Sequence, residues 1–493
     1  MKHINVAIKN LIDATKESDL VKAEENLNYL ISNKPPLNNN WLGVAKMAML
    51  LGKIKLAIDI LNIYQPSKYE LKENLKRLTL LVEIGQIHNA YSCSLGLLES
   101  HPQSPELNHF LCTVALQLGQ KEVSIKCVET VLKAWPTSGQ SWLILVNVAG
   151  QKDDANILNR MLRIKSLVDR TSDNRSKSSF YSALSKVSFN CGSEEEAFEY
   201  ATMSNLFSSK FNDYSYREDK QRVSKILLNS SGVDCDTENN KIVSSDSPIF
   251  IVGLPRSGTT LLEHILCAHS KIINGGETNG MERAARGVVG NEPIGVKDEQ
   301  FDVKLIKKNL SQIRQAYLDF AHQKYGNEGA IIDKSLNNNR YLWLIKQVFP
   351  ESPIIFISRN TIDSAWSCYK THFSQGLSWA NSLTNIAEYF SVENTLTDFW
   401  KSKYDGDLFL LNYSDLVTEP ARYLQLLCEY CGLKYESTLL DFYNQDRAIY
   451  TASVSQVRKS INVNSIGISK VLEDKLAPFI QHYNNQVTTD RVL

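Results

Sequence analysis

Two hydrophobic patterns divide the 493-residue chain near its middle. The first half has the amphipathic spacing of helices, in which apolar positions recur on one helical face. After residue 248, continuous apolar runs alternate with longer helix-like segments. The four runs are 249–252, 330–332, 354–357 and 408–411. Continuous apolar strands between helices indicate a parallel sheet covered on both faces, so we predict a multidomain protein with an all-helical first part and an α/β second part.

The helical part repeats itself at spacings of 33 and 34 residues. Three copies share a glycine after an apolar residue: Leu51-Gly52-Lys53, Ile84-Gly85-Gln86 and Leu118-Gly119-Gln120. A small residue follows each glycine by five positions, and a proline closes each unit: Ala57 and Pro66, Ala90 and Pro102, Ser124 and Pro136. Weaker copies are Gly150 with Ala155 and Gly192 with Ala197. This is the tetratricopeptide signature of paired helices that stack into a solenoid, with a generic helical bundle as the alternative.

Shifts in composition set the predicted domain boundaries. Residues 1–207 hold the helical repeats, and a solenoid of this kind has a concave surface suited to peptides or proteins. Residues 208–247 turn polar, which predicts a helical connector around 217–228 followed by an exposed loop. Residues 248–493 form the α/β domain, where ligands are expected at the carboxyl ends of the parallel strands.

The first apolar run of the α/β domain leads into a loop and then a helix. The loop is Gly253-Leu254-Pro255-Arg256-Ser257-Gly258-Thr259-Thr260. Free N–H groups at a helix N-terminus bind phosphate-like anions. We therefore expect Arg256 and the N–H groups of Ser257, Gly258, Thr259 and Thr260 to hold one. The spacing is that of a P-loop, but Thr259 stands where a P-loop for nucleoside triphosphates has its lysine, which argues against ATP chemistry.

Two motifs resemble those of sulfotransferases. Pro255 to Thr260 resembles the loop with which this family binds the 5′-phosphosulfate end of 3′-phosphoadenosine 5′-phosphosulfate (PAPS). Arg359, just after the run 354–357, and Ser367, eight positions later, resemble the pair that binds the 3′-phosphate. An arginine fork and a hydroxyl from the next helix can grip one phosphate together. The resemblance implies that PAPS is the co-substrate and that no metal is required.

Within the family, the C-terminal half resembles the tyrosylprotein sulfotransferases and bacterial sulfotransferases that carry tetratricopeptide repeats. Gly275-Gly276-Glu277-Thr278 falls where the tyrosylprotein enzymes have Gly-Glu-Glu-Thr, which implies that Glu277 is the catalytic base. The same likeness implies that Arg283 lies on the acceptor side. A later segment resembles a loop that folds over the cofactor, with three candidate contacts: Ser453, Lys459 and Lys470.

Two further candidate site residues follow apolar runs. Lys334 comes just after the run 330–332. It is predicted to stabilise the bridging oxygen of the leaving phosphate, and a solvated lysine is the alternative. Tyr413 follows the run 408–411 and resembles the family's nucleotide-side tyrosine, with a buried core tyrosine as the alternative. Four candidates thus come just past strand ends, where a parallel sheet places its ligands: Arg256, Lys334, Arg359 and Tyr413.

Composition excludes several other classes of function. Lys and Arg together number 54, as do Asp and Glu, so no excess charge favours nucleic acid or an anionic membrane as a partner. Cys428 and Cys431 have CxxC spacing without a second pair, so we predict buried thiols rather than a zinc site. We expect neither a signal peptide nor a membrane span, and therefore a cytoplasmic protein. The membrane-anchored, lumenal animal tyrosylprotein enzymes differ in this respect.

The sequence therefore predicts a PAPS-dependent sulfotransferase that acts on a hydroxyl group. A protein or peptide tyrosine, held by the helical repeats, is the favoured acceptor. A small phenol, an alcohol or a carbohydrate remains an alternative, because a general base at Glu277 requires only a hydroxyl that can lose a proton. Two other classes also remain: a P-loop nucleotide kinase that uses Asp333 for magnesium, and a non-catalytic repeat scaffold. The oligomeric state is not predicted.

Overall fold

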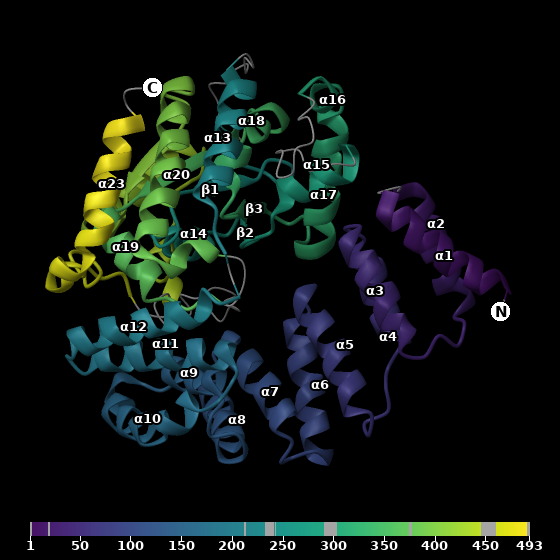
Figure 1. The fold of residues 1–493 in the computed structure, drawn as a ribbon. Coiled ribbons are helices and arrows are strands. Elements are labelled where there is room, and N and C mark those ends of the chain that lie inside the picture. The colour runs from purple at the N-terminus through teal and green to yellow at the C-terminus, as the bar shows by residue number, and fades with distance from the viewer. Residues whose placement is uncertain are drawn as a thin grey trace.

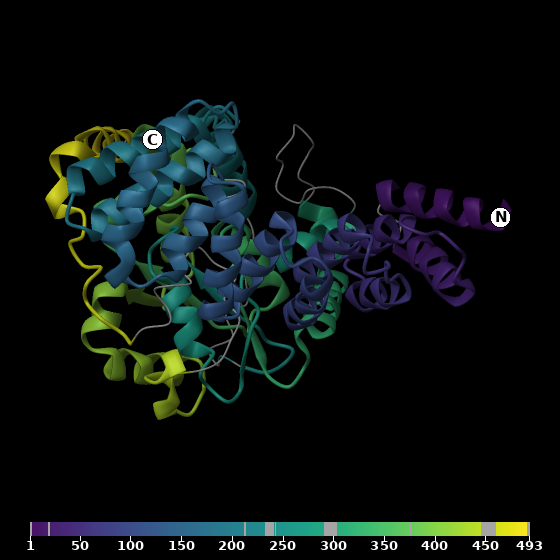
Figure 2. The ribbon, with the colours of Figure 1, turned by 90° about the horizontal axis from the view of Figure 1, so that it is seen from below.

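A helical region and an α/β domain lie against each other in the molecule (Figure 1). The computed structural model describes residues 2–17, 20–211, 213–231, 241, 243–289, 303–373, 377–444 and 460–490. The helical region forms an arc along one side of the α/β domain, and its first two helices extend away from that domain (Figures 1 and 2). Within these ranges, no helix combines the length and the apolar character needed to cross a membrane.

Helices form the arc throughout its described length. They are α1 (Lys2–Glu17), α2 (Leu20–Asn33), α3 (Asn40–Leu50), α4 (Ile54–Ile63), α5 (Leu71–Glu83), α6 (Ile87–Ser100), α7 (Pro105–Gln117), α8 (Lys121–Ala134), α9 (Gly139–Val148), α10 (Asp154–Asp169), α11 (Asn174–Asn190) and α12 (Glu194–Ser208). Successive helices pack in pairs, such as α3 with α4, α5 with α6 and α7 with α8. The all-helical prediction is confirmed, and the assignment of these pairs to tetratricopeptide repeats stays a prediction.

The repeated glycines lie in left-handed turns between paired helices. The φ angle is 73° at Gly52, 87° at Gly85 and 76° at Gly119, a region that glycine adopts without steric cost. The small residues five positions later have no exposed surface, which permits close helix approach: Ala57, Ala90 and Ser124. The copy at Gly150 differs, because a 3-10 turn follows α9 there and Ala155 is exposed. The repeat pattern is thus regular through α8 and breaks at α9, and it returns between α11 and α12, where Gly192 has a φ of 84° and Ala197 is buried.

The α/β domain is built on five parallel strands in the order β2-β3-β1-β4-β5. They are β1 (Ile249–Val252), β2 (Ile272–Asn274), β3 (Ala330–Asp333), β4 (Ile354–Ser358) and β5 (Phe409–Asn412). Four strands coincide with the four apolar runs, so the predicted parallel sheet is confirmed. The edge strand β2 has only three residues and is not marked by an apolar run, so the sequence pattern missed it.

Helices cover both faces of the sheet. One face packs against α15 (Gly280–Val289), α17 (Leu310–Tyr325), α18 (Asn338–Val348) and α20 (Leu383–Lys403). The other packs against α14 (Thr259–Leu266), α21 (Tyr413–Thr418) and α22 (Pro420–Tyr430). Alternate residues of β1 supply the two cores, with Phe250 on the first face and Ile251 on the second. Cys428 and Cys431 are buried free thiols in the second core.

Further helices complete the domain. They are α16 (Val303–Lys308), α19 (Thr361–Tyr369), α23 (Ala477–Asp490) and the 3-10 turns η2 (Ser378–Asn381), η3 (Ser437–Leu439), η4 (Phe442–Asn444), η5 (Lys470–Leu472) and η6 (Asp474–Leu476). The helix α19 follows β4 directly and carries Ser367. The same helix also contacts the helical region.

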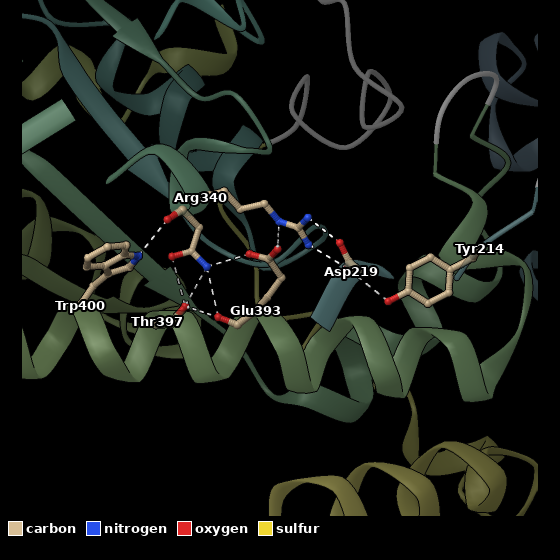
Figure 3. A network of polar contacts seen from close by, with 7 residues as sticks. Tyr214, Asp219, Arg340, Glu393, Thr397 and Trp400 are labelled. Carbon is tan, nitrogen blue, oxygen red and sulfur yellow. Dashed lines mark hydrogen bonds and ion pairs between the residues drawn. The ribbon is translucent and has the colours of Figure 1, made fainter. Parts of the chain in front are cut away.

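The predicted connector helix is α13 (Tyr216–Ser231), and it packs into the α/β domain. Figure 3 shows the polar network that fixes it. Arg340 on α18 donates to both oxygens of Asp219 on α13, at 2.6 and 2.9 Å, and to Glu393 on α20 at 2.6 Å. Tyr214 donates to Asp219 at 3.2 Å. Because two carboxylates share this buried guanidinium, they raise the pKa of Arg340 despite its burial, and α13 is structurally part of the α/β domain.

The helical region contacts the α/β domain at two places. Near its start, α4 packs against α17, and Phe320 of α17 belongs to the hydrophobic core of the first helices. Near its end, Phe198 of α12 stacks on Trp366 of α19, with ring centroids 5.8 Å apart. His372, just after α19, contacts the hydroxyl groups of Ser178 and Ser179 on α11 at 3.2 and 3.1 Å. The second contact therefore involves the same helix that carries Ser367.

Candidate active site

The loop between β1 and α14 has a backbone that only glycine fits at its last position. The φ angle of Gly258 is 108°, and a Cβ there would lie 2.5 Å from Cδ2 of Tyr413. Arg256 also has a left-handed φ, of 70°. The loop turns sharply in this way to begin α14 at Thr259, where the first N–H groups of the helix have no intrahelical partner. Thr259 and Thr260 are therefore placed to offer N–H groups to an anion.

Ser257 takes a different part from the one predicted for its backbone. Its N–H donates to the carbonyl of Leu254 at 3.1 Å and is occupied in this structure. Its hydroxyl is buried and has no hydrogen-bond partner among the described residues. A buried hydroxyl without a partner costs free energy unless a ligand satisfies it. The side chain of Ser257, rather than its N–H group, is the better candidate to meet an anion.

Arg256, Arg359 and Ser367 come together, and we refer to them as the arginine side of the site. The Arg256 Nε donates to the Ser367 Oγ at 2.9 Å, and the Arg359 Nη1 donates to the Arg256 carbonyl at 3.1 Å. The Arg359 Nε is buried with no partner among the described residues. Burial lowers the pKa of both arginines, so the loss of hydration outweighs the opposite charge near them. Both guanidinium groups nevertheless stay charged.

Tyr413 lies under the arginine side. It is buried at the start of α21, and the Arg359 guanidinium is 5.0 Å from the centroid of its ring. The same ring limits the space at Gly258. Tyr413 is therefore buried and packs against both Arg359 and Gly258 of the loop between β1 and α14, which we call the anion loop. Its contact with a nucleotide stays a prediction.

The segment before η5 is tied to the arginine side. The Arg359 Nη2 donates to the Ser465 carbonyl. Asp363 of α19 accepts from the N–H groups of Gly467 and Ser469, at 2.8 and 3.0 Å. Lys470 follows these anchors, is exposed, and has its side-chain stem near Gly467. Ser453 and Lys459, the other candidate contacts of this loop, lie outside the described residues.

On the other side of β1, Lys334 lies between two glutamates; we refer to Glu263, Glu277 and Lys334 as the carboxylate side. The Lys334 ammonium is 2.6 Å from Glu277 Oε1 and 3.8 Å from Glu263 Oε2. Lys334 and Glu263 are buried, whereas 42% of the Glu277 side chain is exposed. Glu277 is thus the carboxylate that a substrate can reach. Burial, opposed by Lys334 and assisted by Glu277, raises the pKa of Glu263 to about 7.

Asp333 holds the backbone of the carboxylate side in place. It is fully buried and accepts from the hydroxyl groups of Thr278, Tyr317 and Ser335, at 2.9, 3.0 and 2.6 Å. The Lys334 N–H donates to the Gly276 carbonyl at 2.9 Å, which joins the Glu277 turn to the end of β3. Because its oxygens already accept from these donors, Asp333 acts as a structural anchor. This arrangement removes support from the kinase alternative, which needs Asp333 for magnesium.

Arg283 lies at the contact between the domains. It is on α15, its Nη1 donates to the Met49 carbonyl of α3 at 3.2 Å, and its guanidinium is 4.8 Å from the centroid of the Phe320 ring. The structure does not bring it into contact with Glu277 or Lys334. Its role on the acceptor side stays a prediction.

Glu263 is the main site residue that sequence reasoning missed. It lies on α14, the helix that follows the anion loop, beyond the residues that the motif of that loop covers. The available signal was an acidic residue in a mostly apolar stretch, Leu261-Leu262-Glu263-His264-Ile265-Leu266. A buried acid on such a helix needs a cationic partner, and Lys334 is that partner. Across the described residues, no group of three or more His, Cys, Asp or Glu side chains is arranged to hold a metal ion.

Comparisons with known proteins give a family match and several similar proteins. Residues 248–437 match the model of the sulfotransferase family. An uncharacterized protein of Aquifex aeolicus (strain VF5) is 29% identical over 299 residues, which cover 58% of this chain and 39% of that protein. A putative protein-tyrosine sulfotransferase of Caenorhabditis briggsae is 24% identical over 232 residues, which cover 44% of this chain and 79% of that protein. The chain thus spans about two fifths of the length of the first relative.

Among solved structures, the sulfotransferase domain of the Synechococcus PCC 7002 olefin synthase is similar with a TM-score of 0.33 and 19% identity. The similarity covers 51% of this chain and 98% of that domain. The match to the family model carries the assignment: the C-terminal half of this chain contains a sulfotransferase-family domain at residues 248–437.

Proposed function

We propose that this protein is a PAPS-dependent sulfotransferase that transfers a sulfuryl group to a hydroxyl group, with a protein or peptide tyrosine as the favoured acceptor. The observation that carries the proposal is the pairing, across β1, of an anion loop beside two arginines with an accessible glutamate held by a lysine. One side is suited to a highly charged nucleotide. The other is suited to removing a proton from an acceptor.

The residues of the arginine side fit the phosphate groups of PAPS. The buried Ser257 hydroxyl and Arg359 Nε have no partner among the described residues, and an anion's oxygens satisfy such donors. Arg256 and the N–H groups of Thr259 and Thr260 would hold the phosphosulfate, and Arg359 with Ser367 the 3′-phosphate. Bound PAPS would supply an activated sulfuryl group, with 3′-phosphoadenosine 5′-phosphate as the leaving group.

The chain's own residues then have separable tasks. Glu277 takes the proton from the acceptor hydroxyl, since it is the exposed carboxylate of its side. Lys334, already 2.6 Å from Glu277, stabilises negative charge that develops on the leaving oxygen. Glu263 positions Lys334 from behind. Asp333, whose oxygens already accept hydrogen bonds from three hydroxyl groups, keeps the turn of Glu277 and the end of β3 at a fixed separation.

Two observations favour a peptide tyrosine over other acceptors. The relative from Caenorhabditis briggsae is described as a putative protein-tyrosine sulfotransferase and matches 44% of this chain. In addition, a helical region contacts the α/β domain beside α15 and α17, close to the turn that carries Glu277. Stacked helical repeats offer extended surfaces for peptides, so we propose that this region holds the acceptor protein.

The test is incubation of the full chain with PAPS that carries a labelled sulfur and with a panel of acceptors. The panel contains tyrosine peptides, small phenols, alcohols and carbohydrates, and mass spectrometry locates the added sulfuryl group. Sulfated tyrosine in the peptides supports the whole proposal. Sulfation of another acceptor keeps the sulfotransferase activity but removes the tyrosine assignment, and no transfer to any of them, with no binding of the nucleotide, contradicts the activity itself.

A further inference from the structure

Lys370 is a lysine of the site region that no motif indicated. It caps the C-terminal end of α19, and its N–H donates to the Trp366 carbonyl at 3.0 Å. Its ammonium group is 4.7 Å from the centroid of the Phe189 ring, on α11 of the helical region, and 5.4 Å from that of Trp366. Ser367 lies three positions earlier on the same helix, and residues with this spacing share a helical face. Lys370 is therefore held by two rings beside a predicted phosphate contact.

The charges around Lys370 are mostly of the same sign. Among the described residues, Arg256, Arg359 and Lys186 of α11 are cations that act on Lys370, and Asp363 is a carboxylate that does so. Asp363 already accepts from Gly467 and Ser469. In the described part of the chain, no carboxylate forms an ion pair with Lys370. Its other titratable neighbours stay neutral at pH 7, because burial raises the pKa of Cys368 to about 12 and lowers that of His372 to about 4.

Such a cluster is unfavourable by itself. Burial, followed by the positive charges of Arg256 and Arg359, lowers the pKa of Lys370 to about 7. A bound anion would stabilise the ammonium form of Lys370, since it compensates both the lost hydration and the repulsion by the other cations. The aromatic rings alone give a smaller compensation, typical of cation–π contacts.

We propose that Lys370 is a further contact for the phosphate held by Arg359 and Ser367, and that Phe189 of the helical region positions it. The inference rests on the proposed function, because it takes the ligand to be a nucleotide with a 3′-phosphate. It adds a residue that no motif assigns, and it makes the helical region part of the nucleotide site. A phosphate monoester carries a charge of about −1.5 to −2 at pH 7, so a third cation beside it is not in excess.

A proton balance follows from this arrangement. At pH 8 the free protein holds Lys370 mainly as the neutral amine, and a bound phosphate favours the ammonium form. Binding therefore takes up a proton, and the affinity falls as the pH rises above about 7, the pKa of Lys370 in the free protein. The guanidinium groups of Arg256 and Arg359 stay charged and do not contribute to this uptake.

Calorimetry on the full chain tests the inference with two nucleotides, 3′-phosphoadenosine 5′-phosphate and adenosine 5′-phosphate, at pH 8 in two buffers of different ionisation enthalpy. We expect Lys370→Met to weaken binding of the first nucleotide by about 10- to 100-fold, as for a lost charge-assisted contact. Binding of the second should be unchanged, and the proton uptake should disappear. The matched control is Lys68→Met, which removes a lysine 5.2 Å from the ring of Tyr69.

Phe189→Ala should give a smaller loss with the same selectivity for the 3′-phosphate and a reduced proton uptake, and Phe189→Tyr should restore both. Thermal unfolding shows whether either variant is damaged in its fold, which the proton uptake alone does not report. Wild-type affinity and wild-type proton uptake in Lys370→Met would overturn the inference while leaving the proposed function intact. Failure of the wild-type protein to bind either nucleotide would instead overturn the proposed function, and this inference with it.

Discussion

The two sides of the site handle charge in opposite ways. On the carboxylate side, Lys334 lies 2.6 Å from Glu277 and 3.8 Å from Glu263, so the positive charge is compensated within the protein. On the arginine side, the cations Arg256 and Arg359 lie near each other and near Lys370. Among the described residues, Asp363 is the carboxylate near Arg359 and Lys370, and it already accepts from three donor groups. The comparison indicates that one side is complete before any ligand arrives, whereas the other needs an anion to balance its charge.

The two sides should therefore also respond differently to ligand binding. A compensated side keeps its geometry with or without ligand, which suits a group that must receive a proton at a defined position. A side with surplus positive charge is stabilised when an anion binds. We expect changes on the carboxylate side to affect turnover and changes on the arginine side to affect nucleotide affinity.

The largest expected effect is that of Glu277→Gln. The variant keeps the size of the side chain but cannot accept the proton, so turnover should fall by about 10² to 10⁴. Affinity for 3′-phosphoadenosine 5′-phosphate should stay within about twofold, since the arginine side is untouched. Steady-state kinetics and calorimetry measure the two quantities.

The matched control for that variant is Glu282→Gln. Glu282 lies on α15 and contacts Arg286 and Asn337 rather than Lys334. The Glu282→Gln variant should leave turnover unchanged. Wild-type turnover in Glu277→Gln would show that Glu277 is not the base. It would also contradict the assignment of turnover to the carboxylate side and of affinity to the arginine side.

Arg359→Ala is the corresponding change on the arginine side. Loss of a charge-assisted contact should weaken binding of 3′-phosphoadenosine 5′-phosphate by about 10- to 100-fold and leave adenosine 5′-phosphate nearly unaffected. Arg286→Ala removes an arginine on α15 and serves as the control. Equal losses for the two nucleotides, measured by calorimetry, would mean that Arg359 does not distinguish the 3′-phosphate.

Gly258→Ala tests the loop that joins the two sides. Both Gly258 and Gly52 have a left-handed φ, of 108° and 73°, but of these two only the Cβ at Gly258 would meet another side chain, that of Tyr413 at 2.5 Å. Backbone strain costs about 1 to 3 kcal/mol, and we expect Gly258→Ala to lower the free energy of unfolding by more than Gly52→Ala does. Urea denaturation of the two variants gives the difference, and equal losses would show that the contact with Tyr413 does not constrain the loop.

The last expected effect is a pH dependence of stability that comes from Glu263. Its folded pKa of about 7 is above its ordinary value of 4.5, so the folded protein holds a proton between these pH values that the unfolded chain has released. The free energy of unfolding therefore falls as the pH rises through this window, by about 1.4 kcal/mol per unit of pKa difference at most. Glu263→Gln stays neutral and should show a weaker decline between pH 5 and pH 7.5 in urea denaturation. An unchanged decline would mean that Glu263 is ionised throughout.

Local patterns predicted the frame of the molecule well. The run 249–252 coincides with β1, and the connector expected around 217–228 is α13. Hydrophobic runs and turn-forming residues are local signals, so one sequence suffices for them. The strand β2 escaped because Ile272–Asn274 offers only two apolar residues.

The site was predictable where motifs exist and not where partners are distant in sequence. The resemblance pairs Ser367 with Arg359 around one phosphate, whereas in the structure the Ser367 hydroxyl accepts from Arg256, so the shared grip of Arg359 and Ser367 stays a prediction. Glu263 was missed because its partner Lys334 belongs to another strand end, and spacing along α14 indicates only a helix. Lys370 was missed for a related reason, since Phe189 comes from the helical region. Residue types and intervals do not encode how two domains pack.

The two contacts of the helical region have a practical consequence for expression of this protein. A fragment that begins at residue 248 would leave Trp366 without its stacking partner Phe198, and Phe320 without the core of the first helices. It would also lack α13, whose Asp219 shares the Arg340 guanidinium with Glu393. Such a fragment would expose aromatic side chains and carry an unbalanced buried charge, so its aggregation in solution would say nothing about the roles proposed for Glu277 and Lys334.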